Sequence, residues 1–78
     1  MDFDKKVLGE RIKKRREYCE ILQIDLAASC GITASQISHI EHVRKLPSLP
    51  IIAVIASILH TSVDFLIKNA IPDIENGL

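Results

Sequence analysis

The hydrophobic residues of this chain recur every three or four positions, as in amphipathic helices, and no stretch alternates as a half-buried strand does. The five helices that this pattern predicts cover about residues 4–18, 23–30, 34–42, 49–59 and 63–71. A chain of 78 residues is therefore predicted to form one all-α domain over residues 1–71, followed by a flexible tail over residues 72–78.

The connection between the second and third predicted helices has the features of a helix-turn-helix over about residues 23–42. Gly31 suits the left-handed backbone that ends a helix, and Thr33 is a favourable N-cap for the next one. Ala27 offers the small side chain that two helices need where they cross at a steep angle.

Two charged residues fall on inward-facing sides of predicted helices. Arg16 lies four residues after Ile12 on the apolar side of the first helix, and Glu41 lies close to the inward side of the third. Because a buried charge without a partner is very costly, we expect Arg16 and Glu41 to form an ion pair.

The opposite side of the third helix carries small and polar residues, because Ile37 and Ile40 point inward. These outward residues are Ser35, Ser38, His39 and His42, with Ala34 and Gln36 at the flanks. They form either an ordinary solvated face or a DNA-reading face, and the helix-turn-helix spacing favours the second. No metal site is expected, because His39 and His42 have no further ligands at suitable spacing.

The formal net charge is zero, which weakens a nucleic-acid hypothesis without removing it. Residues 5–16 carry seven basic residues and one acid, whereas residues 17–43 carry four acids and neither lysine nor arginine. Within the basic run, we expect Lys13, Lys14 and Arg15 to lie in solvent or near a distant phosphate.

Cysteine content and hydropathy indicate a cytoplasmic protein without membrane association. Cys19 and Cys30 lack metal-binding spacing and are expected to be buried thiols in a reducing compartment. The apolar run at residues 49–59 is 11 residues long, and a transmembrane helix needs about 20. No signal-peptide pattern is visible.

Several short motifs together resemble the Cro/C1-type (XRE) helix-turn-helix family of DNA-binding regulators. The motifs are LGERIKKRRE, Gln23-x-x-Leu26-Ala27, Gly31-Ile32-Thr33, Ile37-Ser38-x-Ile40-Glu41, Pro47-Ser48-Leu49 and Ser62-Val63-Asp64-x-Leu66. The resemblance covers residues 8–66 without gaps and implies a five-helix, lambda-repressor-like DNA-binding domain.

The resemblance also implies roles for individual residues. Those expected to contact bases are Ala34, Ser35, Ser38 and His39, and those expected to contact phosphates are Gln23, Thr33, His42, Arg44 and Lys45. It further implies that Arg16 and Glu41 are the ion pair between the first and third helices. The chain departs from the family at Glu20, Leu22, Val43 and His60, where we expect altered loop geometry and cap strength.

The fourth helix carries more apolar surface than one inward face requires. With Ile52, Ile55, Ala56 and Leu59 inward, a second stripe remains at Ile51, Val54 and Ile58. We expect a homodimer interface formed by Ile51, Val54, Ile58, Phe65, Ile67 and Ile71. The alternative is that the fifth helix covers this stripe within one chain.

The predicted function is a sequence-specific, DNA-binding transcriptional regulator, a homodimeric repressor on a pseudo-palindromic operator in double-stranded DNA. A protein-interaction module is the other interpretation: an antitoxin-like or anti-repressor partner that uses the apolar stripe and binds DNA weakly or not at all. An enzyme is not expected, because no nucleophile with a base, no metal set and no phosphate loop is found, and no cofactor is expected either.

Overall fold

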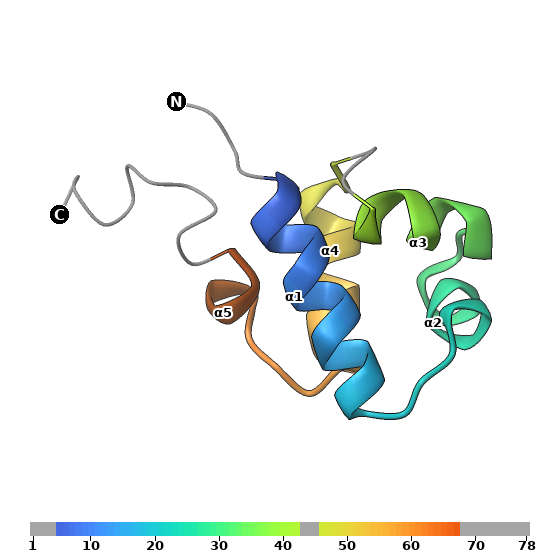
Figure 1. Ribbon diagram of the computed structural model, residues 1–78, viewed down its shortest axis with the longest axis horizontal. Coiled ribbons are helices and arrows are strands. Elements are labelled where there is room, and N and C mark those ends of the chain that lie inside the picture. The colour runs from blue at the N-terminus through green and yellow to red at the C-terminus, as the bar shows by residue number, and fades with distance from the viewer. Residues whose placement is uncertain (1–4, 43–45, 68–78) are drawn as a thin grey trace, which may run out of the picture.

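The computed structural model describes residues 5–42 and 46–67, which form five helices around one apolar core (Figure 1). The helices are α1 (Lys5–Tyr18), α2 (Gln23–Cys30), α3 (Ala34–Glu41), α4 (Leu49–Ile58) and α5 (Val63–Ile67). The predicted all-α architecture and order of helices are confirmed. The predicted end of the fifth helix at Ile71 and the predicted tail lie outside the described residues.

Helix α1 runs through the middle of the molecule, with α2 and α3 on one side, α5 on the other and α4 behind it (Figure 1). All five helices or their ends send aliphatic side chains into the core between them. The large side chains buried most completely are Leu8, Ile12, Leu26, Ile37, Ile55, Leu59 and Leu66. Each contributes about 1.5–3 kcal/mol through removal of apolar surface from water, so aliphatic side chains build the core of the described residues.

Three helices end in the same hydrogen-bonded turn, with one residue in the left-handed conformation. Those residues are Glu20 (φ 58°), Gly31 (φ 72°) and His60 (φ 54°). The bonds that close the turns run from Ile21 N to Arg16 O, from Ile32 N to Ala27 O and from Thr61 N to Ala56 O, at 2.9–3.1 Å. A glycine adopts this conformation at no steric cost. Glu20 and His60 keep the same turn as Gly31 despite their side chains. The loop geometry expected to differ from that of the family stays a prediction, and Val43 lies outside the described residues.

Helices α1 and α3 approach so closely that their backbones touch at Gly9. A Cβ atom on Gly9 would lie 2.5 Å from the carbonyl oxygen of Ile40 and 3.0 Å from that of Glu41. Both atoms belong to the backbone at the end of α3, so neither moves aside as a flexible side chain would. Gly9 thus sets the distance between α1 and the C-terminal end of α3.

The second apolar stripe of α4 is partly covered within the chain. Ile51 and Ile58 are half-buried against the core, as is Ile67 of α5. Val54 and Phe65 remain 38% and 50% exposed. The stripe that we predicted to be open is therefore smaller than the sequence indicated, because α4 and α5 fold against the same core.

The two cysteines are free thiols, and both are half-buried rather than fully buried as predicted. Desolvation raises the pKa of the Cys30 thiol above its ordinary value, which favours the unreactive protonated form. None of the helices in the described part of the chain has the length and apolar character needed to cross a membrane.

Candidate nucleic-acid interface

Helix α3 has one side packed into the protein and the other open to solvent. Ile37, Ile40 and Glu41 are buried, so they hold the helix from behind. Ser35 and His39 are exposed one turn apart, and Ser38 is half-buried beside them. The structure therefore brings the predicted polar residues together on the outward side of α3.

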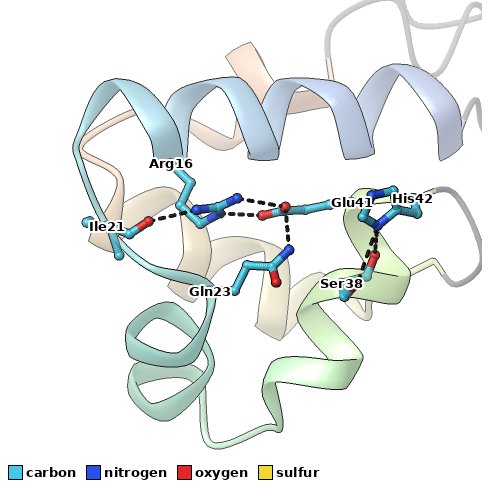
Figure 2. A network of polar contacts seen from close by, with 6 residues as sticks. All are labelled: Arg16, Ile21, Gln23, Ser38, Glu41 and His42. Carbon is cyan, nitrogen blue, oxygen red and sulfur yellow. Dashed lines mark hydrogen bonds and ion pairs between the residues drawn. The ribbon is translucent and has the colours of Figure 1, made fainter.

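The predicted pair of Arg16 and Glu41 is present and doubly bonded. Arg16 Nε lies 2.7 Å from Glu41 Oε2, and Arg16 Nη2 lies 3.1 Å from Glu41 Oε1 (Figure 2). The third guanidinium nitrogen, Nη1, donates to the carbonyl oxygen of Ile21 at 2.8 Å. The pKa of Arg16 is raised, because the hydrogen bond to Glu41 raises it more than burial lowers it. This pair ties the last turn of α1 to the end of α3.

Gln23, predicted to touch a phosphate, is also part of this network. Its Nε2 donates to Glu41 Oε1 at 3.0 Å (Figure 2). A primary amide has two N–H donors, so the bond to Glu41 occupies one of them. The residue before it, Leu22, provides no side-chain cap for α2. Sequence reasoning missed the contact between Gln23 and Glu41, since nothing in their spacing indicates it.

The first turn of α3 is closed by a reciprocal pair of hydrogen bonds. Thr33 Oγ1 accepts from the backbone N–H of Gln36 at 3.1 Å, and Gln36 Oε1 accepts from the backbone N–H of Thr33 at 2.8 Å. The predicted N-cap at Thr33 is therefore confirmed, and it holds the Gln36 amide back against the helix start. Ala34 is half-buried against the core, so its methyl group lies at the edge of the outward side.

The last turn of α3 orders His42 against its own helix. His42 Nδ1 lies 2.8 Å from the carbonyl oxygen of Ser38 and 3.3 Å from its hydroxyl oxygen (Figure 2). These contacts direct the other ring nitrogen, Nε2, away from them. Arg44 and Lys45, predicted to bind phosphates, lie outside the described residues.

The predicted position of Arg15 in solvent is wrong. Its Nε donates to the carbonyl oxygen of Leu59 at 2.8 Å, and its Nη2 donates to that of His60 at 2.9 Å. Carbonyls at a helix C-terminus lack partners within the helix, and a cation satisfies both their hydrogen bonding and the helix dipole. Arg15 thus caps α4, and its partners lie 44 and 45 residues away in sequence. In contrast, Lys14 is exposed, as predicted, whereas Lys13 is half-buried.

A short α2 is followed by a sharp turn at Gly31, and α3 then packs one side into the protein and leaves its other side open to solvent. These features define a helix-turn-helix protein. The helix-turn-helix domain family model matches residues 7–65, so the chain belongs to that family. No curated protein matches the chain in sequence. Within the described residues, no three His, Cys, Asp or Glu side chains are grouped as metal ligands.

Solved structures of Cro/C1-type regulators share this fold, which confirms the resemblance drawn from the sequence. The P22 c2 repressor in complex with the synthetic operator 9T is 31% identical with a TM-score of 0.75, and the match covers 80% of this chain and 94% of that one. The biofilm regulator SinR in complex with DNA is 30% identical with a TM-score of 0.69, over 76% of this chain and 95% of that one.

A third similar structure is the restriction-modification controller protein C.AhdI from Aeromonas hydrophila. It is 25% identical with a TM-score of 0.75, and the match covers 81% of this chain and 91% of that one. The family and these neighbours are DNA-binding regulators and not enzymes.

Proposed function

We propose that this protein is a homodimeric transcriptional repressor that binds a pseudo-palindromic operator in double-stranded DNA. The observation that carries the proposal is the two-sided character of α3, whose back is buried while Ser35 and His39 are exposed on its front. The similar structures of the P22 c2 repressor and SinR, both complexes with DNA, support it.

The proposed contacts divide into base contacts and phosphate contacts. Bases would be met by Ala34, Ser35, Ser38 and His39, and phosphates by Gln23, Thr33, His42, Arg44 and Lys45. An imidazole N–H of His39 can donate to guanine N7 or O6, whereas a serine hydroxyl discriminates poorly because it both donates and accepts. Phosphate contacts and DNA shape would therefore supply much of the affinity, and each half-site would bind weakly.

A second copy would raise the affinity by adding a second half-site, centred about 34–36 Å from the first along the DNA. The proposed dimer surface joins the exposed Val54 and Phe65 to the partly buried stripe of α4 and α5. That stripe comprises Ile51, Ile58, Ile67 and, beyond the described residues, Ile71. Light scattering coupled to chromatography tests this surface, and a monomer at high micromolar concentration would contradict it.

Selection of bound sequences from a random DNA pool at stated salt tests the reading face. We expect an enriched pseudo-palindrome for the native chain and a relaxed preference for the double variant Ser35→Ala/His39→Ala. Ser57→Ala, on an exposed position of α4, is the matched control and should keep the native preference. Circular dichroism confirms that the variants fold. An unchanged preference in the double variant would remove α3 as the reading element.

A protein-interaction module is favoured by one observation at the start of α2. Leu22 and Ile24 are 64% and 63% exposed there, with the exposed acids Glu20 and Asp25 beside them in sequence. Apolar and acidic groups are poor neighbours for phosphates. Salt titration of DNA binding separates the two functions, because each phosphate contact contributes about −0.9 to the slope of log K against log salt. A slope near zero would favour the interaction module.

A further inference from the structure

A groove between α1 and α5 combines positive charge with aromatic surface. It has a volume of about 300 Å³ and is lined by Arg11, Lys14, Arg15, Tyr18 and Phe65. In a chain whose formal net charge is zero, this lining brings together three cations and two aromatic rings. Such a lining is complementary to a ligand with both carboxylates and an apolar group.

Two of the cations are held in place. Arg15 is fixed by the carbonyls of Leu59 and His60, with its guanidinium carbon 4.9 Å from the centre of the Tyr18 ring. Arg11 donates to the carbonyl oxygen of Phe65 at 2.9 Å and lies over that residue's ring at 5.8 Å. Carbonyl oxygens carry no formal charge, so the Arg15 cation keeps its attraction for a carboxylate, and little side-chain entropy is lost on binding.

The groove faces away from the proposed DNA surface. At 100° per residue, the groove residues of α1 lie on average about 160° around the helix from Gly9 and Arg16. Gly9 and Arg16 are the positions where α1 meets α3, by close approach at one and by the ion pair at the other. Figure 1 accordingly shows α3 and α5 on opposite sides of α1. DNA on α3 and a ligand in this groove would therefore not overlap.

We propose that this groove binds an acidic segment of a protein partner. Carboxylates of the segment pair with Arg15 and Lys14, and an apolar side chain lies between the rings of Tyr18 and Phe65, which are 77% and 50% exposed. The volume is near the lower end of the roughly 300–1,000 Å³ typical of ligand pockets, which suits one anchoring side chain and its neighbours. Phe65 also belongs to the proposed dimer surface, so the segment competes with dimerisation at this ring while it leaves the α3 face open to DNA.

The test uses a fluorescein-labelled peptide in which glutamates flank a leucine and a phenylalanine, titrated with the full chain. The comparison peptide has glutamine in place of each glutamate. We expect anisotropy to rise with the acidic peptide only, and amide shifts in isotope-labelled protein to centre on Lys14, Tyr18 and Phe65. Lys14→Glu should raise Kd about tenfold, because it places like charge against the ligand.

Lys13→Glu is the matched control, because it makes the same charge change on α1 at a residue outside the groove lining. It should raise the peptide Kd by less than about threefold. Lys14→Glu should lower DNA affinity no more than Lys13→Glu does, because Lys13 lies nearer than Lys14 to Gly9 around α1. Equal weakening of peptide binding by the two variants, equal binding of the glutamine peptide or shifts centred on α3 would overturn the proposal. So would self-association that Lys14→Glu abolishes, or a loss of DNA binding specific to Lys14→Glu.

Discussion

Replacing Glu41 with alanine strands a buried cation in the middle of the fold. Arg16 is 9% exposed and would keep only the carbonyl of Ile21, at 2.8 Å, as a partner. Breaking one side of a buried ion pair costs about 3–5 kcal/mol. Gln23 also loses its acceptor, but it is half-buried and water replaces part of that bond. We expect Glu41→Ala to lower the free energy of unfolding by about 3–4 kcal/mol, against a total of roughly 4–12 kcal/mol for a domain of this length.

Urea denaturation followed by circular dichroism measures this change as a shift of the midpoint at constant slope. The matched variant is the double replacement Arg16→Met/Glu41→Leu, which fills similar volume without a buried charge. We expect it to recover most of the lost stability, because apolar replacements of buried pairs are often neutral or stabilising. A loss below about 1 kcal/mol for Glu41→Ala would refute the reasoning, as would a double variant no more stable than the single one.

Further substitutions at four positions test the backbone features of the fold. Glu20→Gly and His60→Gly should each raise the free energy of unfolding by about 1 kcal/mol, since glycine relieves the left-handed strain; an unchanged denaturation midpoint would argue against strain there. Gly9→Ala should lower the free energy of unfolding by about 1–3 kcal/mol and weaken DNA binding, because the new methyl group pushes α1 away from α3. Helix propensity alone predicts that alanine would raise the free energy of unfolding. Thr33→Ala should cost about 1 kcal/mol in thermal or urea unfolding, whereas Thr33→Ser should keep most of the cap.

The ion pair was predictable because two helical patterns each left a charged residue on an inward side. Arg16 and Glu41 have opposite charges, so each could neutralise the other. The cap that Arg15 places on α4 was not predictable, because its acceptors are backbone carbonyls, which every residue has. The close approach at Gly9 left only a weak signal. A glycine inside a helix lowers stability by about 1 kcal/mol relative to alanine. Its presence in α1 therefore pointed to a steric reason, but it did not show that α3 is the helix that comes close.

The proposed dimer surface marks a second feature that the sequence predicted only in part. A helical pattern identifies apolar stripes, but it does not say how far a neighbouring helix covers them. Ile51 and Ile58 are half-buried because α4 and α5 share one core, while Val54 remains exposed. That outcome depends on the angle between two helices, which no local pattern encodes.

The contact at Gly9 has a consequence for how this protein can change over time. The position of α3 is set from behind, by backbone atoms at Gly9 and by the buried Ile37, Ile40 and Glu41. Ser35 and His39 contribute nothing to that support, being exposed on the other side. Substitutions at these two positions are therefore nearly free of structural penalty. With the proposed reading role of α3, lineages could acquire a new target sequence without first acquiring a more stable scaffold.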